Sequence, residues 1–284
     1  MEKYRNWRAE LKKCLLDNTR SYMIENFAFQ SSLWEMQSEL LKMLSSKKYM
    51  VVTKSRDVGF THLMAAYVAC EMVLNSDGVE DTSQRHFTIR YMAPNHNMGT
   101  HFASLVKSYL TRIPSELYIA ENVVVRSKNN EICVGKAILT VKTDDVQFDN
   151  IGFSHPYDVI IYDEPVAGKT SKQDFDITNI IGALRLNTSK LIVGGTPNHR
   201  VKKWYDVVTD AKNKCVHLII NWATNKNHRL SDDDVPIPVI DNNGNWHLTN
   251  EWLRDRRKRY IDIDDFEEEI NCKVWREKVI KEYA

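Results

Sequence analysis

Two short segments of the chain contain residue types that bind phosphate and activate water. The first, KSRDVGFT, spans residues 54–61 and separates a short β-branched run from a long apolar one. Its end keeps the last glycine and the hydroxyl of the phosphate-binding pattern G-x-x-x-x-G-K-[ST]. Backbone N–H groups in such a loop point at phosphate, and the hydroxyl can ligate Mg²⁺. The segment therefore predicts a nucleotide-binding loop formed by Lys54, Ser55, Arg56, Asp57, Val58, Gly59, Phe60 and Thr61.

This loop departs from the pattern at its lysine, where the chain has Phe60. Lys54, at the start of the loop, has a long flexible side chain that can reach phosphate oxygens instead. Arg56 supplies a second cation, with a planar fork suited to phosphate. Asp57 would repel phosphate, so we expect its side chain to point outward or to pair with a nearby cation. An ordinary strand-to-helix turn is the alternative interpretation of the segment taken alone.

The second segment places two carboxylates directly after an apolar run. Residues 159–162 lead straight into Asp163 and Glu164. Burying carboxylates without a cation or a donor is costly, so the pair calls for a chemical reason. Asp163 is a candidate Mg²⁺ ligand beside Thr61, and Glu164 is a candidate to orient and deprotonate a water molecule. The alternative is a pair of acids that caps a helix at a loop edge.

A third segment, GGTPN, follows another apolar run at residues 194–198. Gly194 and Gly195 allow a close approach of the backbone, and Thr196 and Asn198 supply short polar groups. These two residues are candidates to sense a terminal phosphate and to couple its loss to the remaining structure. A turn made of turn-forming residues is the alternative.

Alternating strands and helices must position these segments. The expected helices cover residues 2–17, 31–46 (capped by Ser31 and Ser32), 61–75, 95–113, 174–188 and 201–212, with two more near 248–260 and 264–276. The expected strands cover residues 48–53, 86–93, 157–165, 189–198 and 215–221, with a hairpin before residue 143. Strands apolar on both faces predict an α/β fold with a mostly parallel, doubly wound sheet. Residues 231–246 are rich in turn formers and predict a loop or small hairpin.

Composition excludes some classes of protein. The 284 residues carry a formal charge of +1, so overall charge does not indicate a polyanion partner, although RDRRKR at residues 254–259 is a local basic cluster that a charge-laced surface helix also explains. The five cysteines are far apart in sequence and predict reduced thiols. Neither a signal-peptide core nor an apolar run long enough for a membrane span occurs. We expect a cytoplasmic protein without a membrane partner.

The ordered set KSRDVGFT, VIIYDEP and GGTPN resembles the ATPase domain of the large terminase subunit, the DNA-packaging motor of tailed phages. Some members of that family carry the loop lysine at the front, as Lys54 is here. The resemblance covers about residues 30–276 and implies a P-loop NTPase core of the ASCE, RecA-like class. It also aligns LWEMQSELL, residues 33–41, with the adenine-recognition segment, which makes Gln37 the candidate for binding the base.

The resemblance implies Mg²⁺-dependent ATP hydrolysis that moves double-stranded DNA into a capsid in the cytoplasm of an infected host cell. Lys54, Arg56 and Glu164 are the implied catalytic residues, with Arg56 or a neighbour's arginine as the finger. The implied partners are double-stranded DNA, a portal protein, a small terminase subunit and further copies of the chain in a ring.

The predicted organisation is a helical extension (residues 1–30), an ATPase core (31–230) and a C-terminal loop and helical subdomain (231–284), without a nuclease domain. We therefore expect no DNA cleavage by this chain. Two alternatives remain open: a helicase-like DNA-remodelling ATPase, and a packaging adaptor whose nucleotide site is degenerate, as Phe60 and Asp57 suggest.

Overall fold

The computed structural model describes eleven stretches of the chain, and the statements below concern these alone. They are residues 19–76, 86–114, 126–128, 131–143, 156–165, 177–197, 215–224, 228–240, 246–261, 266–267 and 270. The expected helices 2–17 and 201–212, most of the expected helix 264–276, and Asn198 lie outside them.

An eight-stranded sheet forms the centre of the molecule, in the order β3-β4-β5-β2-β6-β7-β1-β8. The six strands from β5 to β8 in that order pair in parallel, whereas β3, β4 and β5 pair antiparallel. This sheet confirms the predicted α/β fold with a mostly parallel sheet. The strands are β1 (Tyr49–Lys54), β2 (Phe87–Ala93), β3 (Arg126–Lys128), β4 (Glu131–Val134), β5 (Ala137–Thr143), β6 (Tyr157–Asp163), β7 (Thr188–Gly195) and β8 (Val216–Ile220).

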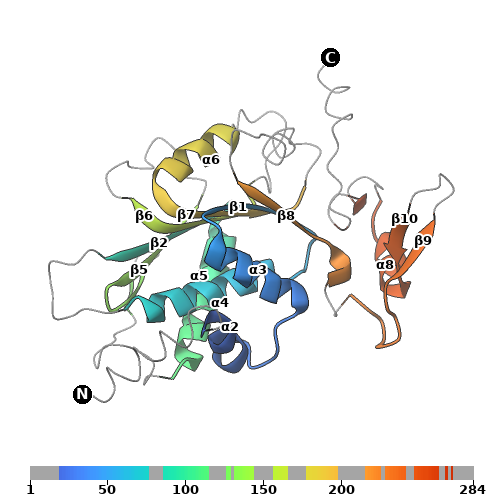
Figure 1. Ribbon diagram of the computed structural model, residues 1–284, viewed down its shortest axis with the longest axis horizontal. Coiled ribbons are helices and arrows are strands. Elements are labelled where there is room, and N and C mark those ends of the chain that lie inside the picture. The colour runs from blue at the N-terminus through green and yellow to red at the C-terminus, as the bar shows by residue number, and fades with distance from the viewer. Residues whose placement is uncertain are drawn as a thin grey trace.

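Helices cover both faces of this sheet (Figure 1). On one face lie α2 (Thr19–Met23), the π-helix η1 (Ile24–Ala28), α3 (Glu35–Ser46), α4 (Phe60–Leu74) and α5 (His96–Arg112), and on the other lies α6 (Ile177–Leu186). The larger hydrophobic cluster lies on the side of α3, α4 and α5, and a smaller one joins α6 to β6 and β7. Nearly every residue of α4 is buried, which explains why its sequence is apolar all round rather than amphipathic.

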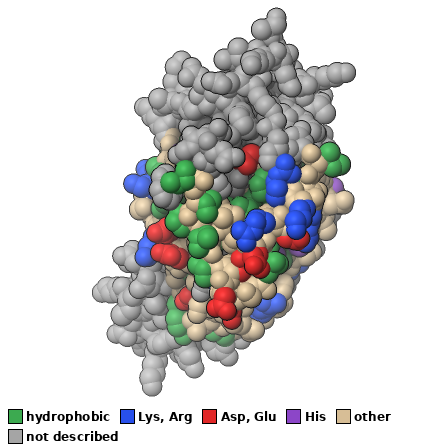
Figure 2. Space-filling view, turned by 90° about the vertical axis from the view of Figure 1, so that its right-hand side faces the viewer, with side chains coloured by type: hydrophobic (Ala, Val, Ile, Leu, Met, Phe, Trp, Pro, Cys, Tyr) green, Lys and Arg blue, Asp and Glu red, His purple; other side chains and the backbone are tan. Residues whose placement is uncertain are grey.

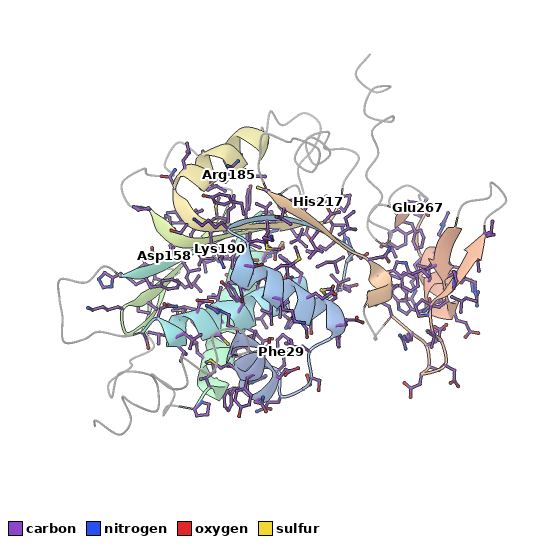
Figure 3. The ribbon with its side chains drawn as sticks, in the orientation of Figure 1. Phe29, Asp158, Arg185, Lys190, His217 and Glu267 are labelled. Carbon is purple, nitrogen blue, oxygen red and sulfur yellow. The ribbon has the colours of Figure 1, made fainter. Side chains whose placement is uncertain are left out.

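Side chains tie the helical layers to the sheet on either side (Figure 3). The ammonium group of Lys190, on β7, donates to the carbonyl oxygen of Leu44 at the end of α3. The guanidinium carbon of Arg185, on α6, lies 4.9 Å from the ring centroid of Tyr49 on β1. The central strands are therefore held from both faces, as parallel sheets require.

A smaller unit follows β8 and consists of the short helix η5 (Trp222–Thr224), the hairpin β9 (Ile237–Ile240) and β10 (Trp246–Thr249), and α8 (Glu251–Arg257). It lies at the β8 end of the sheet (Figure 1). Its own hydrophobic cluster contains Trp222, Leu253, Phe266 and Ile270. Trp222, which precedes the predicted division at residue 231, packs into this cluster. The division itself stays a prediction.

Two predicted helix starts are wrong. Residues 248 and 249 belong to β10, and the helix expected from 248 begins at Glu251, because the side chain of Asn250 accepts from the N–H of Leu253 and caps it. The helix expected from residue 31 begins at Glu35. Ser31 and Ser32 are exposed and do not cap it.

Composition-based predictions can be compared with two structural findings. Among the described residues, Cys70 is a buried free thiol, as expected for a reduced cysteine. Across the described stretches, no helix combines the length and the apolar character that crossing a bilayer requires.

Candidate active site

The three segments singled out in the sequence meet at one edge of the sheet. They follow the carboxyl ends of β1, β6 and β7, and β7 lies between the other two. Ligands of open α/β sheets bind at this edge. The structure therefore brings Lys54, Thr61, Asp163, Glu164 and Thr196 into one cluster.

The loop after β1 enters α4 through a glycine in the left-handed conformation. Gly59 precedes α4 with φ +73°, a left-handed conformation that glycine adopts at little cost. Gly59 has no side chain to cap the helix, so the N–H groups of the first turn of α4 can donate to a phosphate. The amide of Ser55 donates to the carbonyl oxygen of Ile220 at 2.9 Å, and its hydroxyl donates to that of Ile270. These two bonds anchor the loop to β8 and to the C-terminal unit.

Lys54 and Glu164 form an ion pair across the mouth of the loop. The ammonium of Lys54 donates to Oε1 of Glu164, and their side chains are only 8% and 16% exposed. The lysine at the front of the loop thus reaches the carboxylate that follows β6. The Lys54 nitrogen also lies 5.7 Å from the ring centroid of Phe60.

Phe60 occupies the lysine position of the usual pattern but is buried. A Cβ atom on Gly194 would lie 2.3 Å from two ring carbons of Phe60, so the ring rests directly on the backbone of β7. Only the backbone of Phe60 can therefore belong to the phosphate loop, and its side chain is part of the core. Gly194 serves this packing, which the sequence did not indicate.

Asp163 is fully buried, and its two oxygens differ in their partners. Oδ2 accepts from the hydroxyl of Thr61 at 2.8 Å and from that of Tyr91 at 3.0 Å. Oδ1 has no hydrogen-bond partner among the described residues. Burial raises the pKa of Asp163 above its usual value, and the charge of Glu164 adds to this while Lys54 opposes it.

The backbone at Glu164 is strained and firmly held. Its φ is +50°, which is unfavourable for a residue with a side chain. Its N–H donates to the Gly194 carbonyl at 2.7 Å, and its carboxylate accepts from the Thr196 amide at 3.1 Å and hydroxyl at 3.0 Å. Burial alone would raise the pKa of Glu164, but Lys54 and the Thr196 donors hold that pKa below its usual value. Glu164 is thus an oriented carboxylate linked to the segment after β7.

The other predicted site residues lie around this cluster. Gln37 is buried, its Oε1 accepts from the Trp34 amide at 3.0 Å, and its Nε2 faces the Cα of Gly59. Arg56 is exposed. Asp57 is exposed too, has φ +60°, and pairs with Arg256 of α8 at 3.4 Å. This pairing confirms the expectation that Asp57 turns outward to a cation.

Sequence reasoning missed two residues at this site, Tyr91 and Arg256. Each is separated from its partner by many residues, Tyr91 by 72 from Asp163 and Arg256 by 199 from Asp57.

Val58, the remaining residue of the predicted loop, is buried. Within the described stretches, no group of three or more His, Cys, Asp or Glu side chains could hold a metal. A metal here must therefore rely on few protein ligands, as Mg²⁺ does when phosphates complete its shell.

Comparisons with solved structures identify the fold. The HK97 bacteriophage large terminase matches with a TM-score of 0.58 at 13% identity, over 89% of this chain and 53% of that one. The ATPase domain of the Thermus phage P74-26 large terminase matches with a TM-score of 0.56 at 12% identity, over 87% and 96%. A large terminase from a thermophilic bacteriophage, in complex with ADP, matches with a TM-score of 0.50 at 13% identity, over 84% and 52%.

These matches establish the resemblance as one of fold. The chain spans about half the length of the HK97 protein and nearly all of the P74-26 ATPase domain. No protein-family model matches the sequence. No curated protein matches it either. The α/β core therefore shares the fold of large terminase ATPase domains.

Proposed function

We propose that this chain is an ATPase that powers the packaging of double-stranded viral DNA, the motor part of a large terminase. The observation that carries the proposal is the meeting of a loop lysine with a paired acid at one sheet edge, where Lys54 contacts Glu164 and Thr61 contacts Asp163. The fold match to terminase ATPase domains, one of them with ADP, supports the same reading.

In this proposal the triphosphate lies across the loop after β1. The first-turn N–H groups of α4 and the ammonium of Lys54 bind its phosphate oxygens, and exposed Arg56 supplies further positive charge from the same loop. Gln37, whose amide lies beside Gly59, is placed to bind the adenine edge.

Glu164 is the proposed general base. Its low pKa keeps it ionised at neutral pH, and its link to Thr196 fixes its direction. When a phosphate draws Lys54 away, the carboxylate loses its ion-pair partner and becomes a better acceptor for the proton of a water molecule. Thr196 is then the residue through which a change at Glu164 reaches the segment after β7, which is our proposed coupling role for Thr196 and Asn198.

The residues present also fit Mg²⁺. Oδ1 of Asp163 is a buried oxygen without a partner, and the Thr61 hydroxyl lies against the same carboxylate, so both are hard oxygen ligands. A bound Mg²⁺ neutralises phosphate charge and polarises the bond to be broken. Asp163 and Thr61 would hold it.

The surface that meets DNA is not indicated by a single patch. On the face of the molecule that carries the hairpin and α8, Lys and Arg side chains stand beside Asp and Glu and are interspersed with apolar ones (Figure 2). Asp255 of α8 pairs at 2.6 Å with Arg259, which follows the helix, and Arg256 of α8 pairs with Asp57. We propose that DNA phosphates are contacted by several subunits of a ring, each of which contributes few cations. The portal and small-subunit partners belong to the same proposal.

An ATPase assay with three variants tests the enzymatic part. We expect Mg²⁺-dependent turnover by the native chain and a loss of turnover of at least about 100-fold in both Glu164→Gln and Lys54→Ala. Of these two variants, only Glu164→Gln should still bind ATP. The control is Glu39→Gln, a change on the outside of α3 that should leave turnover unchanged. Equal background turnover in all four proteins would instead support the packaging adaptor, which buried Phe60 favours.

A further inference from the structure

Tyr91 lies in the core next to the proposed metal site, on a strand that the sequence did not connect with it. It comes from β2, which pairs in parallel with β6, and Tyr91 stands opposite Ile161 in that register. Its side chain is fully buried, and its ring stacks on Phe102 of α5 with 3.5 Å between centroids and 4° between planes. The ring is therefore packed against α5 on one side of the sheet.

That hydroxyl contacts one particular oxygen of Asp163. Tyr91 donates to Oδ2 at 3.0 Å, and Thr61 donates to the same atom at 2.8 Å. A carboxylate oxygen accepts about two such bonds, so Oδ2 is saturated. The other oxygen, Oδ1, has no partner in the described part of the chain and is buried with the rest of the side chain.

We propose that Tyr91 is a positioning residue that holds Asp163 by Oδ2 so that Oδ1 is presented to Mg²⁺. Thr61 is not sufficient for this, because its oxygen is itself a proposed metal ligand. Tyr91 lies on β2, outside the loop, and holds the carboxylate with a hydroxyl that takes no part in metal binding in this proposal. Donors behind a metal-binding carboxylate raise metal affinity by about 10- to 100-fold in other sites.

This inference rests on the proposed function, and the test must separate the two. The variant is Tyr91→Phe, which removes one oxygen and keeps the ring stack on Phe102. The matched control is Tyr109→Phe, which also removes the hydroxyl of a buried tyrosine, one that bonds to His62 at 2.9 Å. Mn²⁺ binding in the presence of a non-hydrolysable ATP analogue, measured by electron paramagnetic resonance, reports the site without turnover.

We expect Tyr91→Phe to weaken Mn²⁺ binding about tenfold and to raise the Mg²⁺ concentration for half-maximal ATPase activity by the same factor. Tyr109→Phe should leave both within about twofold. Unchanged Mn²⁺ binding by Tyr91→Phe, beside normal binding by the native chain, overturns the positioning role and leaves the proposed function standing. Absence of binding by the native chain overturns the proposed function and this inference together.

A second variant separates positioning from general stability. Phe102→Leu removes the stacked ring and keeps the Tyr91 hydroxyl, so it should lower the thermal midpoint while it leaves Mn²⁺ affinity within about twofold. If metal affinity instead falls in proportion to the loss of stability in Tyr91→Phe, Phe102→Leu and Tyr109→Phe alike, Tyr91 is only a core residue and the inference is wrong.

Discussion

The ring of Phe60 lies against the Cα of Gly194, where a Cβ atom would come within 2.3 Å of two ring carbons. The first residue of α4 and the seventh residue of β7 are therefore matched to each other. A lysine at position 60 would leave the space over Gly194 empty, whereas any side chain at 194 would displace the ring. Because the ring of Phe60 lies in the core, our proposed function assigns the positive charge to Lys54 at the other end of the loop.

This match predicts a rescue. Gly194→Ala should destabilise the protein by about 1 to 3 kcal/mol through overpacking, as measured by urea unfolding. Phe60→Leu should recover part of that loss in the double variant, since the smaller side chain leaves room for the new methyl group. Gly182→Ala is the control: no described atom lies within 4 Å of its added Cβ in helix α6, so it should stabilise by up to about 1 kcal/mol. Additive effects of the two site variants would contradict the match.

The ion pair between Lys54 and Glu164 predicts an asymmetry in stability. Lys54→Met should lower the free energy of unfolding by about 2 to 4 kcal/mol, because it leaves Glu164 buried beside Asp163 without its cation. Glu164→Gln should cost less than Lys54→Met, since the amide oxygen still accepts from Thr196.

The double variant Lys54→Met with Glu164→Gln provides the check. It should be more stable than the sum of the single effects predicts, by about 1 kcal/mol or more, in a urea-unfolding cycle. A sum that matches the double variant would show that the two groups do not interact in solution.

Local sequence patterns predicted the parts of the site that depend on the order of elements along the chain. The apolar runs before Lys54, before Asp163 and at residues 191–193 are buried strands, and the carboxyl ends of parallel strands meet at one edge, so the cluster follows. Nothing more than strand type and chain direction was needed.

Contacts between distant elements could not be predicted in this way. Tyr91 is one apolar residue in a strand, and its hydroxyl finds Asp163 only because β2 lies next to β6. The start of α3 also depends on a contact that the sequence pattern did not predict: the side chain of Gln37 accepts a hydrogen bond from the Trp34 amide. Nearby Ser31 and Ser32 are exposed to solvent. Several residues near a helix start can cap it, and the neighbouring structure selects among them.

Asp57 predicts an electrostatic effect on nucleotide binding. Asp57→Asn removes its charge but keeps a residue that tolerates φ +60°, and ATP should then bind about two- to fivefold more tightly. Asp57→Gly should give the same gain. Arg256→Ala should do the opposite, since it leaves the Asp57 charge without the Arg256 ion pair. Fluorescence titration with a labelled ATP analogue measures all three.

Stability in these variants should barely change, because the pair is an exposed contact at 3.4 Å with the Asp57 side chain 70% exposed. If Asn and Gly at position 57 gave different affinities, backbone conformation rather than charge would be responsible. If Arg256→Ala tightened binding, Asp57 would not act on the phosphates through its charge.

His228 predicts acid sensitivity of the C-terminal unit. It is buried, its ring lies 4.0 Å from that of Trp252, and Nδ1 lies 3.0 Å from the Trp222 carbonyl oxygen. Burial lowers its pKa below the usual 6.5, against the raising effect of that carbonyl. Folded His228 therefore stays neutral at a pH where the unfolded chain is already protonated. Stability is complete above about pH 6.5 and is lost as the pH falls from there through the pKa of the folded form.

Urea unfolding followed by tryptophan fluorescence at pH 7.5 and pH 5.5 measures this loss. The native chain should lose stability between the two pH values, and His228→Gln should lose less. His217, on β8 with Nε2 2.8 Å from the Thr53 hydroxyl, also has its pKa lowered by partial desolvation, but its side chain is exposed, so His217→Gln should remove only a smaller share of the pH dependence. The double variant His217→Gln with His228→Gln lacks both imidazoles. If it loses as much stability between the two pH values as the native chain does, other groups cause the acid sensitivity.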